Sequence, residues 1–166
     1  MYQLIPQIRF KNYPISLVEE FNFLGIMFDK HLLWNKQIFN LSQKLSRAIG
    51  ILNRLKHFIP KYCLKLIYNA LFNSHLNYGI LLWGHKAKNI EYLQKKAIRA
   101  VSSSHFLAHT DPLFKKENIL KAQDIFTTRS ILLFYRLQNN LLPQNIASIF
   151  DNHNVSIHRY PTSDSI

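Results

Sequence analysis

The segment 34–59 carries the most regular pattern in the sequence. Its apolar residues recur at spacings of three and four: Ile38, Leu41, Leu45, Ala48, Ile49, Leu52, Leu55 and Ile59. At about 100° per residue they fill an arc of roughly 120° on a helix, which is wide enough to dock on a core. The pattern predicts one long amphipathic helix over residues 34–58, and Pro60 is expected to stop it.

The opposite side of this predicted helix is basic. On a helical projection Lys36, Arg47 and Arg54 fall within about 20° of one another, and Lys44 lies beside them. Residues 30–90 contain ten Lys or Arg and no Asp or Glu, in a chain of formal net charge +12. A long stretch of one sign favours an anionic partner, of which nucleic acid is the commonest inside cells. An anionic membrane, an acidic protein or no partner remain as alternatives.

The remaining patterns predict a mainly α fold, with a short N-terminal β-hairpin followed by a bundle of four to five helices. Two or three short strands are expected over 7–10 and 20–28, with a turn at 11–14 and with Ile15 and Val18 in the middle of the hairpin. Gly25 is expected to mark a bulge or a close backbone approach. Further helices are expected at 61–76, 90–101, 119–138 and 143–150, with Asn89 as the N-cap of the second. Residues 102–110 have the composition of a loop.

This organisation predicts three parts: the hairpin at 1–29, a helical domain at 30–150, and a flexible tail at 151–166. No apolar run approaches the roughly 18–20 residues of a membrane span, and no leader pattern begins the chain. We therefore expect an intracellular protein, in the nucleus or cytoplasm, with no membrane partner. The single Cys63 excludes an internal disulfide.

The sequence contains no recognisable catalytic constellation. Enzymes that use two metal ions need clustered carboxylates, yet the chain has nine acidic residues and no adjacent Asp pair. Glu19 and Glu20 are neighbours, but alternation in a strand would point them to opposite faces. His105 and His109 have helical spacing, in a segment that looks like a loop, so a surface or capping role is favoured. We expect no catalytic residue, no metal site and no bound cofactor.

Four large aromatic residues allow two interpretations. Trp34, Tyr68, Tyr78 and Trp83 have the ring type that stacks on nucleic-acid bases, but aromatics at helical spacing belong more often to a core. Tyr78 and Trp83 flank a break in the helical pattern at 77–79, so these two are the better candidates for function.

Four stretches, taken in order, resemble one family. They are FLGIMFD at 23–29 followed by Leu33-Trp34; Gly50-Ile51-Leu52; LIYNAL at 66–71 with SHLNYG at 74–79 and Trp83-Gly84; and LQKKAIR at 93–99. These stretches are similar to consecutive blocks of the jockey-type reverse transcriptases of non-LTR retrotransposons. The resemblance covers roughly residues 8–140.

In that family these blocks follow the polymerase palm. The resemblance implies that the hairpin, with Phe23, Leu24 and Gly25, corresponds to the primer grip, and that the helices form the thumb that closes on the template–primer duplex. The family's catalytic Asp pair has no counterpart here, and neither do the fingers or most of the palm. The full-length family enzyme would use Mg²⁺, but this chain alone is expected to be inactive. The resemblance thus implies a C-terminal piece of an RNA-directed DNA polymerase: a truncated reading frame, a degenerate copy or an incomplete gene model.

Such a piece would hold a duplex without extending it. The residues expected to contact the phosphates of an RNA–DNA hybrid or duplex DNA, irrespective of sequence, are Lys36, Lys44, Arg47, Arg54, Lys95, Lys96 and Arg99. The alternative is a functionless relic or a helical protein-interaction module. A missing palm would leave an apolar hairpin face uncovered, so we also expect an exposed patch and self-association. The patch would comprise Ile8, Phe10, Phe23 and Ile26.

Overall fold

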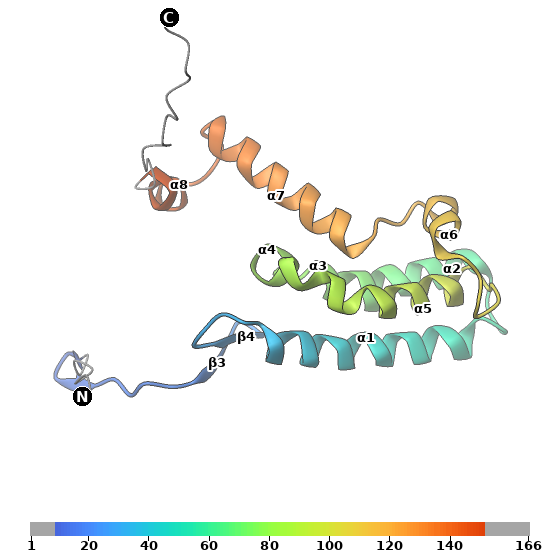
Figure 1. The fold of residues 1–166 in the computed structure, drawn as a ribbon, viewed down its shortest axis with the longest axis horizontal. Coiled ribbons are helices and arrows are strands. Elements are labelled where there is room, and N and C mark those ends of the chain that lie inside the picture. Colours follow the sequence, from blue (N-terminus) through green and yellow to red (C-terminus); the bar gives the residue numbers. More distant parts are fainter. Residues whose placement is uncertain (1–8, 152–166) are drawn as a thin grey trace, which may run out of the picture. The chain divides into compact units, whose positions relative to one another are not determined.

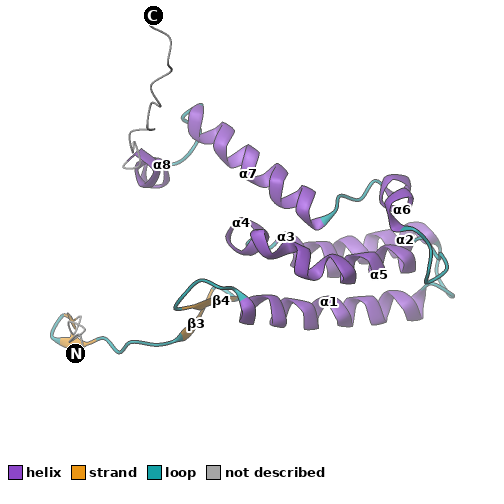
Figure 2. Cartoon of the chain, viewed as in Figure 1, coloured by secondary structure: helices purple, strands orange, loops and turns teal. Residues whose placement is uncertain are grey.

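The computed structural model describes residues 9–151, and this part of the chain is mainly helical (Figure 2). Four short strands come first: β1 (Arg9–Phe10), β2 (Tyr13–Pro14), β3 (Glu20–Phe23) and β4 (Ile26–Asp29). The α-helices are α1 (Asn35–Leu55), α2 (Lys61–Ile67), α3 (Ser74–Asn77), α4 (Ile80–Trp83), α5 (Glu91–Val101), α6 (Thr110–Glu117), α7 (Ala122–Gln138) and α8 (Gln144–Asp151). A π-helical stretch, η1 (Tyr68–Asn73), and a 3-10 helix, η2 (Gly84–Ile90), complete the set. The expected fold class, mainly α after an N-terminal hairpin, is confirmed.

The chain divides into two compact units, Met1–Phe126 and Thr127–Ile166. Strand β4 contacts α1 within the first unit. The expected division into three parts stays a prediction. The expected tail, apart from Asp151, lies outside the described residues. Within the second unit many large apolar side chains of α7 and α8 are exposed, among them Ile131, Phe134, Tyr135 and Ile149.

The N-terminal strands form two separate antiparallel hairpins, β1–β2 and β3–β4. The described residues thus form two hairpins, not the single hairpin expected with Ile15 and Val18 in its middle, and these two residues lie outside the strands. The second stretch folds back on itself because Leu24 and Gly25 both have positive φ, 50° and 81°, as a two-residue hairpin loop requires. The Gly25 N–H also donates to the Asn22 side chain at 2.9 Å. Gly25 is thus a turn residue, not a bulge.

Asp29 organises the connection from β4 into α1. Its carboxylate accepts backbone N–H groups from His31 at 3.2 Å, Leu33 at 2.9 Å and Trp34 at 2.7 Å. These bonds, that of Leu33 above all, hold the pKa of Asp29 below its ordinary value. They also stabilise a loop in which Trp34 has a positive φ of 62° and a buried side chain. One carboxylate thereby sets how the hairpin enters the long helix.

Helix α1 buries one face, as its periodicity predicts, and lies alongside α5 and the run of α2, η1 and α3 (Figure 1). Its buried apolar residues are Ile38, Leu41, Leu45, Ala48, Ile49 and Leu52. The helix ends at Leu55, three residues before the expected end. There the N–H groups of Phe58 and Ile59 both donate hydrogen bonds to the Leu55 carbonyl, at 2.9 and 3.1 Å, just before Pro60.

The second helical run is present as predicted, but its middle turn is π-helical. Helices α2, η1 and α3 follow without interruption from 61 to 77, and the break comes where expected, with Tyr78 extended and Gly79 at φ 63°. The Trp83 indole N–H donates to the Tyr78 carbonyl at 3.0 Å and ties the turn to α4. The break is therefore a tight, hydrogen-bonded corner.

The later helices differ from expectation mainly at their starts. Asn89 is not an N-cap, because the 3-10 helix η2 runs through it and Ile90 precedes α5 instead. Helix α6 begins at Thr110, at the end of the stretch expected to be a loop. Helix α7 begins three residues later than predicted.

A buried glutamine connects the core helices. Gln94 is fully buried, and its amide nitrogen donates to the Tyr68 hydroxyl at 3.1 Å and to the Leu120 carbonyl at 2.9 Å. Its amide oxygen accepts the Ala122 N–H at 2.8 Å. Burial raises the pKa of Tyr68 to about 12. Every polar atom of Gln94 that faces the core thus has a partner, and the three bonds join α5 to η1 and to the start of α7.

Candidate nucleic-acid interface

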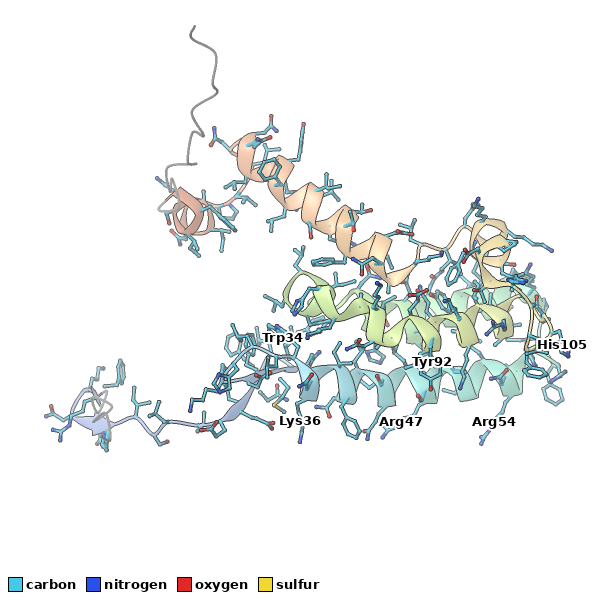
Figure 3. The ribbon with its side chains drawn as sticks, in the orientation of Figure 1. Trp34, Lys36, Arg47, Arg54, Tyr92 and His105 are labelled. Carbon is cyan, nitrogen blue, oxygen red and sulfur yellow. The ribbon has the colours of Figure 1, made fainter. Side chains whose placement is uncertain are left out.

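The outer side of α1 presents four cations, which we name the α1 basic face: Lys36, Lys44, Arg47 and Arg54. All four are exposed, and Figure 3 shows Lys36, Arg47 and Arg54 pointing away from the other helices along one side of α1. At about 1.5 Å of rise per residue, Lys36 and Arg54 are about 27 Å apart along the axis. That length matches about eight base pairs of a duplex.

Little negative charge opposes this face. Lys36 lies 3.9 Å from Glu20, but both side chains are about half exposed, so solvent screens the pair and leaves Lys36 available to a ligand. Among residues 9–151, Lys44, Arg47 and Arg54 form no ion pair.

A cleft adjoins the α1 basic face, and we name it the hairpin cleft. It has a volume of about 320 Å³, and none of its described lining residues is acidic. The lining comprises Asn22, Gly25, Met27, Gln37, Asn40, Leu41, Gln43, Lys44, Arg47, His75 and Tyr78. The structure thus brings two of the predicted phosphate contacts, Lys44 and Arg47, together with Gly25 of the primer-grip-like turn. Phe23 and Leu24, the other two residues of that turn, are exposed beside it.

The wall of the cleft is held by contacts between distant segments. The Tyr78 hydroxyl donates to the Leu24 carbonyl. Ile26 packs so closely on Gly79 that a Cβ at position 79 would lie 2.4 Å from the Ile26 Cδ1 atom. Gln37 of α1 accepts the Met27 N–H at 3.0 Å. Segments 23–29 and 74–79, two of the blocks that carry the resemblance, therefore meet in space.

The expected apolar patch is only partly exposed. Phe10 and Phe23 are 64% and 58% exposed, as predicted. Ile26 is 7% exposed because it packs on Gly79, so its assignment to the patch is wrong. Ile8 lies outside the described residues.

None of the three cations of α5 lines the hairpin cleft, and each makes a different contact. Lys95 pairs with Glu91 at 2.8 Å, whereas the Lys96 ammonium lies over the Tyr92 ring at 4.6 Å. Arg99 donates from Nε to the Ala108 carbonyl at 3.0 Å. Lys96 and Arg99, but not Lys95, line a second pocket with residues of α1.

The aromatic candidates belong mostly to the core. Trp34 is 5% exposed and Tyr68 and Trp83 are fully buried, so the preference for Trp83 as a functional residue was wrong. Tyr78 remains half exposed at the hairpin cleft. Two exposed rings were missed, Phe39 and Phe106. Phe39 was detectable, because it falls off the apolar arc of α1, whereas the position of Phe106 depends on the loop conformation.

The histidines give no catalytic arrangement within residues 9–151. His105 is exposed, and its ring accepts the Leu107 N–H at 3.3 Å, while His109 precedes α6 without capping it through its side chain. In the described part of the chain, no three His, Cys, Asp or Glu side chains are grouped to hold a metal ion. No helix there has the length and apolar character needed to cross a bilayer.

Searches of protein-family models, curated proteins and solved structures find no match to this chain.

Proposed function

We propose that this chain holds the sugar–phosphate backbone of a template–primer duplex, either an RNA–DNA hybrid or duplex DNA. In this proposal it is the thumb-like, non-catalytic part of a non-LTR retrotransposon reverse transcriptase. The observation that supports the proposal most is the α1 basic face, four cations on one helix that continue into the hairpin cleft.

The arrangement suits backbone binding rather than sequence reading. Lys and Arg contacts to phosphates position a protein on a duplex, whereas base readout needs side chains that enter a groove. Helix α1 is anchored by its whole apolar face, so its cations keep their spacing when a ligand binds. Each phosphate that they neutralise releases counterions and makes the affinity depend on salt.

Fluorescence anisotropy with a labelled 16-base-pair hybrid tests the proposal. The variant Lys36→Glu/Arg47→Glu/Arg54→Glu reverses three charges that have no part in the core. The matched control Lys88→Glu/Lys115→Glu/Lys116→Glu makes the same change in net charge at exposed residues elsewhere. We expect the affinity for the duplex to fall at least about tenfold further in the first variant than in the control.

Equal losses in the two variants would show that net charge alone drives binding, and would overturn the assignment to the α1 basic face. Binding that is insensitive to salt would contradict a backbone contact. The proposal also expects no polymerase activity from this chain alone, which a primer-extension assay with Mg²⁺ checks.

Exposed aromatics favour a second candidate, a protein-interaction module. Phe21 stacks on Phe28 at 5.1 Å and is half exposed, and Phe23 and Leu24 are exposed at the same hairpin. Together they form an apolar surface of the kind that partners cover. This candidate predicts concentration-dependent self-association, which light scattering measures. A clean monomer at high concentration, combined with duplex binding, would favour the first proposal over the second.

A further inference from the structure

The pocket between α1 and α5 plays no part in the duplex-binding proposal. It has a volume of about 420 Å³ and lies where α1 meets α5 and the loop that follows α5. Its polar lining residues are Asn53, Lys56, Lys96, Arg99 and Ser104, and its apolar ones are Ile49, Ala100 and Phe106. We name it the α1–α5 pocket. Three of its described lining residues are cationic, Lys56, Lys96 and Arg99, and none is acidic.

Arg99 is oriented for a bound anion. Its side-chain Nε–H donates to the Ala108 carbonyl at 3.0 Å, and this bond holds the guanidinium. Its backbone carbonyl accepts the Ser104 N–H at 3.0 Å and fixes the start of the following loop. The two terminal nitrogens of its guanidinium form no hydrogen bond within residues 9–151. A planar guanidinium held in this way presents parallel donors that match the oxygens of a phosphate.

Lys56 and Lys96 reach the same pocket from opposite walls. Lys56 follows the last residue of α1, whereas Lys96 stands on α5 with its ammonium over the Tyr92 ring. Neither forms an ion pair in the described part of the chain. Since no acidic residue lines the pocket, its positive charge favours a phosphate group over a neutral ligand.

Phe106 adds a stacking surface beside these cations. Its side chain is 72% exposed, and its ring centroid lies 4.8 Å from that of His105. An exposed ring next to a cationic track is the combination that single-stranded nucleic acid uses, because each unstacked base offers a π-face. A base inside a duplex is already stacked and paired, so only an unpaired nucleotide presents its base to this ring.

We propose that the α1–α5 pocket binds one nucleotide of a single strand, with its phosphate at Lys56, Lys96 and Arg99 and its base against Phe106. The inference rests on the proposed function only for the class of partner, since it concerns a different surface from the α1 basic face. It assigns the chain a single-strand contact in addition to its duplex contact.

The test uses the full chain and three labelled ligands: a ten-nucleotide strand, an abasic oligomer of the same length, and a blunt duplex. Two variants remove the pocket's chemistry, Phe106→Ala and Lys56→Gln/Lys96→Gln. Their controls are Tyr62→Ala, an exposed aromatic elsewhere, and Lys115→Gln/Lys116→Gln. Circular dichroism checks that every variant is folded, and Phe106→Trp tests whether any stacking ring suffices.

We expect Phe106→Ala to weaken binding of the single strand by at least about fivefold and to leave duplex binding unchanged. Phe106→Trp and both controls should bind as the native chain does, and the abasic oligomer should bind less tightly than the normal strand. Single-strand affinity that is unchanged in Phe106→Ala and in Lys56→Gln/Lys96→Gln would overturn the inference, as would equal binding of the abasic oligomer.

The two proposals fail differently. Duplex binding that survives reversal of Lys36, Arg47 and Arg54 overturns the proposed function, yet a Phe106-dependent single-strand affinity would still support the pocket. Absence of binding to all three ligands overturns both.

Discussion

Glycine positions show how single residues determine the packing of this chain. Gly84 is buried, and a Cβ built there would lie 2.2 Å from the Phe126 Cδ2 atom. Gly50 stands in the exposed middle of α1, where an added Cβ meets nothing within 4 Å. The same substitution should therefore have opposite effects at the two positions.

We predict that Gly84→Ala lowers the free energy of unfolding by about 1–3 kcal/mol, because overpacking forces Phe126 to move. Gly50→Ala should raise it by about 0.5–1 kcal/mol, because alanine is the better helix residue. Urea denaturation of both variants measures the difference. If Gly84→Ala were as stable as the native chain, the close packing of Phe126 on Gly84 would be wrong. The double variant Gly84→Ala/Phe126→Leu should recover part of the stability that Gly84→Ala loses.

Gln94 illustrates a residue whose role the sequence does not reveal. Gln94→Leu should cost about 1–3 kcal/mol for each buried partner left without a hydrogen bond, among them the Tyr68 hydroxyl and the Ala122 N–H. Gln43→Leu, on the exposed side of α1, is the matched control and should change stability by less than about 0.5 kcal/mol. Thermal denaturation compares the two, and equal melting temperatures would contradict the buried network.

At the scale of elements, Asp29 couples the hairpin to α1 and makes this junction sensitive to pH. Since folding lowers its pKa, the carboxylate stabilises the native state above the unfolded value near 3.9, and this contribution is lost as pH falls through the folded value. Asp29→Asn should therefore destabilise the chain at pH 7, and the difference from the native chain should shrink as the pH falls below about 3.9. Urea midpoints measured from pH 2.5 to 7 give the comparison, and a constant difference across that range would contradict this role.

Local patterns predicted the elements that depend on local rules. Helix α1 followed from its apolar spacing, and the break at Gly79 followed from turn composition. The hairpin region was predicted, but its division into two hairpins was not, because Leu24 adopts a positive φ that its residue type does not suggest. Helix α6 was not predicted because its eight residues have a weak periodicity, while its packing depends on Phe114 reaching the core.

The candidate sites were predictable only where one helix carries them. Lys36, Lys44, Arg47 and Arg54 share a side of α1 by spacing alone, so the sequence sufficed. The hairpin cleft joins Gly25 to Tyr78 across more than fifty residues, and no local rule places them together. The same limit applies to the α1–α5 pocket, whose cations come from two helices.

At the scale of the whole molecule, the proposed function makes one claim: the helical unit would present a rigid, cationic surface to a nucleic-acid backbone. The described core gives that surface its rigidity, since α1 packs its apolar face along α5 and the α2–α3 run. The claim requires that the residues on the α1 basic face, and not the net charge of +12 in general, set the dependence of binding on salt.

The most direct test is the slope of log affinity against log salt for duplex DNA. We compare the native chain with Lys36→Gln/Arg47→Gln/Arg54→Gln and with the control Lys88→Gln/Lys115→Gln/Lys116→Gln. Each lost phosphate contact lowers the slope by about 0.9, so the first variant should lose up to about three units and the control close to none. Equal slopes for the native chain and the first variant would contradict the account.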